Sequence, residues 1–225
     1  MVTVRDWSDL NQYEYRFIGD ELFDNVPEEI LLKTSSQKVI ATDLARLYVL
    51  QDALREGYKT VVWVDADFLI YKPSEFILPD MDYALGREVW VQNNKHGNLK
   101  AYKNIHNAFM MFRKNNSFLD FYADTALKLV SKNQGTIPPQ FIGPKLLTAL
   151  HNVAGLNVIE TAGMLSPLVI KDIIHGNGPA LDLFNKKSIS PVAGANLCIS
   201  SCDKNEVTAK DMKQLIEVLK SSCGH

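Results

Sequence analysis

The residues best placed for chemistry in this chain are Asp65 and Asp67, which directly follow the apolar run at 60–64. A continuous β-branched and aromatic run is typical of a strand that is covered on both faces. In open α/β sheets, ligands collect at the carboxyl ends of such strands. Side chains two residues apart on a strand point the same way, roughly 7 Å from each other. We therefore expect one carboxylate to bind a metal ion while the other holds a ligand hydroxyl.

The Asp-x-Asp pattern is weak evidence by itself, because the chain contains a second copy at Asp80 and Asp82. This copy follows Pro79 instead of an apolar run, so we interpret it as a turn before a strand at 83–86. The alternative for the first copy is a strand that ends in solvated carboxylates without any binding role.

Other polar residues could converge on the same site. Asp43 and Arg46 lie one turn apart on a helix predicted over 37–55, which should end at Gly57. They are either ligands or a surface ion pair. His175 follows an apolar run predicted as a strand over 168–174, so it is either a core histidine or a metal ligand. The turn at 140–144 is the third candidate.

The predicted elements alternate between strands and helices, which indicates an α/β fold with a mostly parallel sheet flanked by helices. With 225 residues, of which 46% are hydrophobic, the chain can bury the core of a single domain, 1–225. We further expect a mobile loop over 92–103, strands at 108–112 and 157–160, and helices over 117–130, from Pro144 to 150, and from Thr208 to 219.

Composition excludes several partners. The net charge is −2 and no cluster of basic residues stands out, so nucleic acid is not expected as a partner. No apolar run is long enough for a membrane span or a signal peptide. The three cysteines all fall late and are odd in number, which suits a reducing compartment. We expect a soluble, cytoplasmic protein.

The motifs together resemble a known family. An Asp-x-x-Arg motif at 43–46, then Leu50, then a strand ending in Asp65-Ala66-Asp67, and then Pro73 looks like the core of sugar-nucleotide-dependent glycosyltransferases with a DxD sugar-binding region. The closest resemblance is to family-32-like transferases of the capsular polysaccharide type. It extends through Asn107-Ala108, Gly143-Pro144 and His175, and covers roughly residues 10 to 180. The resemblance implies the GT-A fold.

The resemblance also implies roles for the matching residues. Asp43 and Arg46 would hold the donor sugar, Asp65 would reach ribose or sugar hydroxyls, and Asp67 would bind Mn²⁺ or Mg²⁺. His175 would complete the metal site, with Asp65 as a further ligand, and one histidine favours Mn²⁺. We add Asn107, Gln140 and Gly143 as substrate-binding candidates. The expected reaction moves a hexose from a UDP- or GDP-sugar to a glycan or other hydroxyl acceptor, commonly with retention of configuration.

One departure from the family concerns its usual first strand, which forms much of the nucleotide-base pocket. Only six residues precede Trp7, so this strand is expected to be missing. Three explanations stay open: the chain starts late, residues 1–5 supply a substitute, or the nucleotide pocket is incomplete. Trp63 also differs from the residue types expected beside the DxD motif.

Two other classes of protein compete with this interpretation. A haloacid-dehalogenase-type phosphohydrolase also places Asp-x-Asp after an apolar strand, with the first aspartate as nucleophile. That class usually opens its domain with the motif, whereas a long helix precedes it here. The other rival is a non-catalytic domain that binds a sugar nucleotide or glycan and derives from a transferase.

Overall fold

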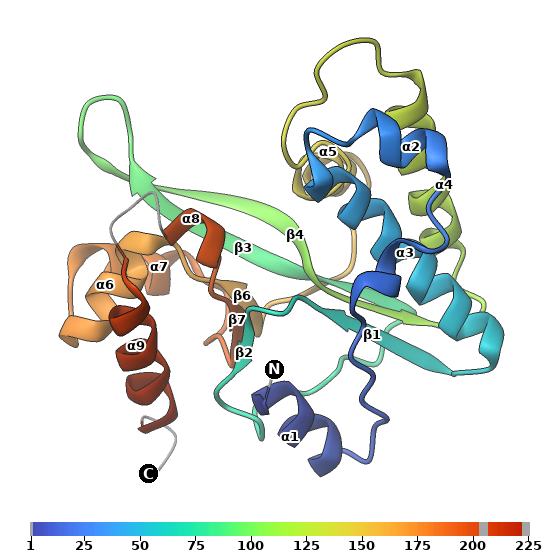
Figure 1. Ribbon diagram of the computed structural model, residues 1–225. Coiled ribbons are helices and arrows are strands. Elements are labelled where there is room, and N and C mark those ends of the chain that lie inside the picture. The colour runs from blue at the N-terminus through green and yellow to red at the C-terminus, as the bar shows by residue number, and fades with distance from the viewer. Residues whose placement is uncertain (1, 203–206, 222–225) are drawn as a thin grey trace.

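The computed structural model describes residues 2–202 and 207–221 and has an α/β architecture of helices around two small sheets (Figure 1). In chain order its elements are α1 (Val2–Leu10), η1 (Asp20–Phe23), α2 (Glu28–Lys33), α3 (Lys38–Glu56), β1 (Thr60–Val64), β2 (Phe68–Ile70), β3 (Tyr83–Asn93), β4 (Leu99–Arg113), α4 (Ser117–Lys132), α5 (Pro144–Ala154), β5 (Val158–Ile159), β6 (Ala162–Met164), α6 (Pro167–His175), α7 (Pro179–Lys187), β7 (Gly194–Asn196), α8 (Ile199–Cys202) and α9 (Ala209–Ser221).

The larger sheet has the strand order β1-β4-β3-β5 and is mixed. Strands β1 and β3 both run antiparallel to β4, while β5 runs parallel to β3. The expectation of a mostly parallel sheet is therefore wrong. A five-residue connection, 94–98, joins β3 to β4, and a connection that short permits only antiparallel pairing.

Strand β1 lies at the edge of this sheet, which was not expected. Its residues are not covered on both faces: Thr60 is exposed and residues 62–64 are partly buried. The Asp65 backbone N–H donates to the Ala108 carbonyl on β4, and the Lys59 carbonyl accepts from Lys114 just after β4. In this register the alternate residues Thr60, Val62 and Val64 direct their backbone N–H and C=O groups away from β4. Within residues 2–202 and 207–221, no strand pairs with that outer edge.

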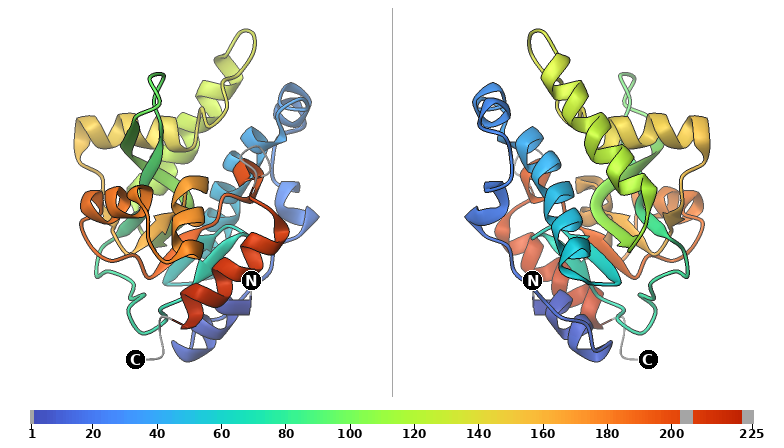
Figure 2. Two further views of the ribbon diagram at one scale, coloured as in Figure 1. Left: turned by 90° about the vertical axis from the view of Figure 1, so that its left-hand side faces the viewer. Right: turned by 90° about the vertical axis from the view of Figure 1, so that its right-hand side faces the viewer.

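The N-terminal residues do not replace a first strand. Residues 2–5 lie in α1, whose buried side chains Val4 and Trp7 pack beside β2. Strand β2 belongs to the second sheet, of order β2-β7-β6. In the two side views α1 lies at the end of the molecule opposite the β3–β4 loop and the α4–α5 connection (Figure 2).

The predicted mobile loop over 92–103 is instead the outer part of a long hairpin. Strands β3 and β4 pair as far as Asn93 and Leu99. The side chain of Asn94 accepts hydrogen bonds from the backbone N–H groups of His96 and Asn98, and Gly97 takes a positive φ of 78°. Asparagine and glycine here mark a tight turn between strands, which explains why a polar composition was mistaken for a loop.

The prediction of a strand over 168–174 is also wrong, because these residues form helix α6. Pro167 occupies its first turn and Gly176 ends it with a φ of 84°. The buried residues Val169 and Ile170, with Ile173 partly buried against the same cluster, follow the helical spacing. A proline at the start and a glycine after the end are local signals for a helix, and they outweigh a short apolar run as a signal for a strand.

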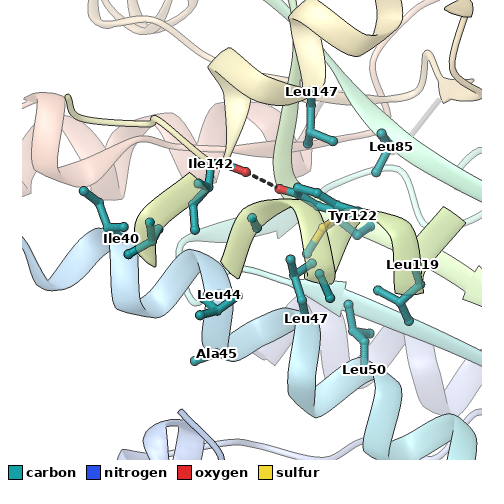
Figure 3. Packing of buried hydrophobic residues seen from close by; sticks show 14 of the residues in the cluster. Ile40, Leu44, Ala45, Leu47, Leu50, Leu85, Leu119, Tyr122, Ile142 and Leu147 are labelled. Atoms are coloured by element: carbon teal, nitrogen blue, oxygen red, sulfur yellow. Dashed lines mark hydrogen bonds between the residues drawn. The ribbon is translucent and has the colours of Figure 1, made fainter. Parts of the chain in front are cut away.

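The predicted helix over 37–55 is confirmed as α3, which forms the main core together with α4. Its residues Ile40, Leu44 and Leu47 are fully buried against α4 and β4 (Figure 3), and Gly57 ends it with a φ of 113°. The predicted helix over 117–130 is confirmed as α4. Phe121 is 51% exposed, while Tyr122 is buried and donates a hydrogen bond to the carbonyl of Ile142.

Several shorter predictions hold. Pro144 opens α5, α9 follows Thr208, and β5 falls within 157–160. The turn at Asp80 and Asp82 leads into β3 as predicted, although β3 runs well beyond 86. No helix among the described residues has the length and apolar content needed to cross a bilayer.

His106 on β4 is a buried histidine with a close neighbour. Its Nε2 donates to the carbonyl oxygen of Ala162 at 3.2 Å, and burial lowers its pKa to about 4. A Cβ on Gly86 would lie 2.1 Å from the imidazole Cε1, so only glycine fits opposite this ring. His106 is therefore neutral at pH 7.

We predict that His106 makes the fold less stable in mild acid. The pKa is 6.5 in the unfolded chain and about 4 in the fold, so the unfolded state takes up the proton first as pH falls. The free energy of unfolding should drop by about 3 kcal/mol between pH 6.5 and 4. Urea denaturation at several pH values measures this loss, and His106→Gln should lose it. Identical pH profiles for both proteins would contradict the assignment.

Candidate functional site

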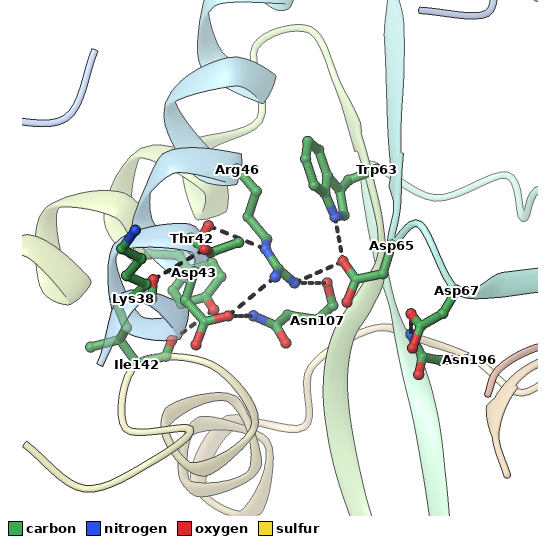
Figure 4. Close-up of polar contacts among 11 residues, drawn as sticks. Lys38, Thr42, Asp43, Arg46, Trp63, Asp65, Asp67, Asn107, Ile142 and Asn196 are labelled. Carbon is green, nitrogen blue, oxygen red and sulfur yellow. Dashed lines mark hydrogen bonds and ion pairs between the residues drawn. The ribbon is translucent and has the colours of Figure 1, made fainter. Parts of the chain in front are cut away.

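Arg46 is a buried cation at the centre of the predicted site, with 5% of its surface exposed. Its guanidinium lies 3.5 Å from Asp43 Oδ1 and 3.0 Å from Asp65 Oδ1, and donates to the Asn107 carbonyl at 3.0 Å. Figure 4 shows it between α3 and the strand that ends at Asp65. Burial alone would lower its pKa, but the neighbouring carboxylates outweigh burial and raise it. The arrangement satisfies the rule that buried charges are paired and hydrogen-bonded.

Asp43 is the most deeply buried carboxylate of this group, with 3% exposed. Burial raises its pKa, while Arg46 and a 2.8 Å hydrogen bond from Asn107 Nδ2 act in the opposite direction. Gly143 lies against this pair, because a Cβ there would be 2.8 Å from Asp43 Oδ2. The N-terminus of α5 follows at once, and its dipole favours the carboxylate.

Asp65 is held on one side and open on the other. Its Oδ1 accepts a hydrogen bond from Trp63 Nε1 at 2.7 Å and forms an ion pair with Arg46 at 3.0 Å. The Arg46 guanidinium also lies 5.5 Å from the Trp63 ring centroid, within range of a cation–π contact. Among the described residues no partner is recorded for Asp65 Oδ2, and the side chain is 25% exposed. This explains why a tryptophan precedes the motif: its indole fixes the first aspartate.

Asp67 belongs to a different set of contacts. Its Oδ1 accepts from Asn196 Nδ2 at 2.7 Å, and its Oδ2 accepts from the Ile199 backbone N–H at 3.1 Å. Figure 4 shows Asp67 and Asn196 apart from the Arg46 group, beyond Asp65. The second sheet and α8 thus position the last carboxylate of the motif, while α3 and β4 position the first.

Two predicted residues lie outside this group. Gln140 is exposed with a φ of 61°, and its carbonyl accepts from the Lys145 backbone N–H, which shapes the turn before α5. His175 is the last residue of α6, with its Nδ1 2.6 Å from the Lys171 carbonyl. No three acidic, histidine or cysteine side chains among residues 2–202 and 207–221 gather as a metal site, so His175 does not join Asp65 and Asp67 there.

A cavity of about 830 Å³ adjoins the two aspartates. Its walls are α1, the extended segment 12–18, the side of α3 that carries Thr42 and Arg46, and the free edge of β1. Asp65 and Asp67 both line it, and aromatic side chains make up much of the remaining wall: Trp7, Tyr13, Tyr15, Phe17, Tyr58 and Trp63. Ligand sites of this size are commonly apolar with a few placed polar groups.

The residues at the cavity fit a divalent cation that is shared with a ligand. Mg²⁺ and similar ions are commonly held by one or two carboxylates together with substrate phosphates, rather than by a complete protein cage. Asp65 Oδ2 and the Asp67 carboxylate supply such oxygens from one wall of the cavity. Two aspartates would leave the remaining coordination positions of such an ion to water or to the ligand.

Sequence reasoning identified Asp43, Arg46, Asp65 and Asn107, and the structure brings these together. Sequence reasoning missed Asn196, which lies 129 positions from its partner Asp67 and belongs to no motif. Trp63 could have been found, because it lies two residues before Asp65 and so projects on the same face of the strand. No protein-family model matches the chain, and neither curated proteins nor solved structures yield a match.

We predict that Arg46 stabilises the fold only as part of its network. Arg46→Met would leave Asp43 and Asp65 without their cation and should lower the free energy of unfolding by about 3 kcal/mol or more. Adding Asp43→Asn should restore part of that loss, because one buried charge is then removed. Urea denaturation of both variants measures the effect.

The matched control is the exposed ion pair of Lys128 and Asp124, whose side chains are 63% and 59% exposed. Lys128→Met should change stability by about 0.5 kcal/mol or less. A loss of similar size in Arg46→Met would show that the buried network contributes no more than a surface pair.

Proposed function

We propose that this protein is a metal-dependent glycosyltransferase that moves a hexose from a nucleotide-diphosphate sugar to a hydroxyl acceptor. The observation that carries the proposal is the joint placement of Asp65 and Asp67 on the wall of the 830 Å³ cavity, next to the buried Asp43–Arg46 network. The cavity volume suits a nucleotide sugar, since pockets for ligands of drug size span about 300–1,000 Å³.

The distribution of polar and apolar groups supports a donor of this kind. Aromatic side chains line the cavity beside the free edge of β1, where the flat faces of a base can stack and backbone groups can accept or donate hydrogen bonds. Asp65 and Asp67 line this cavity, and so does Glu14, whose carboxylate accepts a hydrogen bond from the Tyr58 hydroxyl in the aromatic part. A base would thus occupy the aromatic region and the diphosphate would lie next to the aspartates.

Each residue of the network has a distinct role in this proposal. Asp65 Oδ2 accepts a hydrogen bond from a ribose or sugar hydroxyl, while its Oδ1 is kept in place by Trp63 and Arg46. Arg46 also lines the cavity and offers positive charge toward the phosphates. Asp43, which is 3% exposed, positions Arg46 and Asn107.

Mn²⁺ or Mg²⁺, when bound by Asp67 and Asp65, would neutralise the charge that develops on the diphosphate as the glycosidic bond breaks. Asn196 and the Ile199 backbone hold Asp67 in the orientation that presents it to the cavity. Removal of the metal by a chelator should therefore abolish transfer without unfolding the chain.

A second candidate is a domain that binds sugar nucleotides without turnover. Both oxygens of Asp67 already accept hydrogen bonds from the protein, which reduces their capacity to bind an ion. Such a domain would bind the same donors but release no free sugar and transfer none. The two functions therefore differ in turnover, while both predict occupation of the cavity.

We predict that one nucleotide sugar together with Mn²⁺ raises the melting temperature. Ligand at about 100 times its Kd adds about 2.7 kcal/mol to the native state, which corresponds to a rise of about 5 °C or more. The panel consists of UDP-, GDP-, CDP- and dTDP-sugars, each with and without Mn²⁺. Release of nucleoside diphosphate from the stabilising donor then distinguishes a transferase from a binding domain.

The control variants use the two copies of the motif. Asp67→Asn keeps the shape of the side chain but removes its charge, and should abolish both the metal-dependent shift and turnover. Asp82→Asn changes the exposed last residue of the second copy and should leave both intact. A full shift in Asp67→Asn, or none in the unmodified protein, would contradict the donor site.

A further inference from the structure

The outer part of the β3–β4 hairpin has one face packed against helices and one face that becomes more exposed toward the turn, from the buried Glu88 to the exposed Gln92 and Lys100. Val89, Val91, Leu99 and Ala101 project on one face and pack into the hydrophobic cluster that includes α6, α7 and α9. Figure 1 shows this part of the hairpin running away from β1 beside α6 and α7. The alternate residues therefore project on the other face.

These alternate residues form three cross-strand pairs, which we call the hairpin platform. The pairing register joins Glu88 with Asn104, Trp90 with Tyr102, and Gln92 with Lys100. Side chains opposite each other on antiparallel strands have Cβ atoms about 5 Å apart. The platform is thus a continuous strip with two aromatic rings in the middle and polar groups at both ends.

The two aromatic side chains have no evident structural task. Trp90 and Tyr102 are partly exposed, and neither belongs to any of the three hydrophobic clusters described for the chain. Large apolar side chains normally pack into such clusters, as Phe68, Phe109 and Phe112 do here. Their partly exposed rings are flat apolar surfaces outside the core on which a ligand could stack.

Polar groups surround these rings at hydrogen-bonding positions. Trp90 Nε1 donates to Gln92 Oε1 at 3.0 Å, and Asn104 Nδ2 donates to Glu88 Oε1 at 3.0 Å. The Lys100 ammonium lies 4.8 Å from the Tyr102 ring centroid. The platform therefore combines flat apolar faces with amides, one carboxyl group and one ammonium.

We propose that the hairpin platform binds a neutral carbohydrate chain. The C–H groups of a pyranose carry partial positive charge and stack on the electron-rich face of an aromatic ring. Its hydroxyl groups both donate and accept, which suits the amide groups of Gln92 and Asn104.

The charge of the platform favours a neutral ligand over other classes. Glu88 and Lys100 offset each other, so the strip lacks the basic excess that a nucleic acid or an acidic peptide requires.

The location relates the platform to the cavity without depending on it. Tyr102 lies five residues before Asn107 on the same strand, a distance of roughly 17 Å along β4. If the proposed transferase function holds, the platform would hold the acceptor glycan. If that function fails, carbohydrate binding at the platform remains a separate property.

The test is titration calorimetry of the full chain with maltohexaose, cellohexaose, chitohexaose and α-1,6-linked mannohexaose. We expect at least one of these oligosaccharides to bind. Trp90→Ala and Tyr102→Leu should each weaken that binding about tenfold. Tyr102→Leu keeps apolar bulk and so guards against a loss of fold, which circular dichroism checks for each variant.

Phe121→Ala is the matched control, because Phe121 is an aromatic residue that is 51% exposed on α4. It should leave oligosaccharide affinity unchanged. The metal-dependent thermal shift with nucleotide sugars should be the same in Trp90→Ala as in the unmodified protein, which separates this proposal from the donor site. The proposal would be overturned if none of the four oligosaccharides binds. It would also be overturned if Trp90→Ala and Tyr102→Leu both bind with the affinity of the unmodified protein.

Discussion

The buried charge of Arg46 is the constraint on which the candidate site depends. A guanidinium with 5% exposure must be compensated, and its partners come from three elements: Asp43 on α3, Asp65 after β1 and the carbonyl of Asn107 on β4. These contacts fix where α3 crosses the end of β1. They also direct one oxygen of Asp65 inward and leave the other available to the cavity. The polar network and the open site therefore have one physical origin.

The edge position of β1 supplies the second half of the site. If β1 had a neighbouring strand on both sides, the second neighbour would fill the space next to α3. Here the edge residues Thr60, Val62 and Val64 turn their backbone groups away from β4 toward the aromatic wall. The same topology brings β2 and β7 close to the end of the motif, so that Asn196 can hold Asp67. The two aspartates are consequently positioned by different sheets.

Local signals predicted what depends on local physics. Gly57 marked the end of α3, Pro144 marked the start of α5, and the apolar run at 60–64 is a strand. The Asp-x-x-Arg spacing placed two side chains on one face of α3, which the 3.5 Å contact between them bears out. Strand direction, the edge position of β1 and the partners of Asp67 depend on pairing between distant segments, and one sequence does not encode these in any short pattern. The predicted strands at 83–86 and 108–112 are the inner ends of β3 and β4, but the outer part of the hairpin was missed because the polar stretch 92–103 resembles a loop.

The most direct test of the donor site is anomalous X-ray diffraction from crystals soaked with Mn²⁺ and a nucleoside diphosphate. The manganese signal reports the position of the ion without reference to activity. The account predicts one strong peak between Asp65 Oδ2 and Asp67, in contact with the diphosphate in the cavity beside β1. No peak there, or a peak elsewhere on the protein, would contradict the central claim that these two aspartates form a metal and diphosphate site.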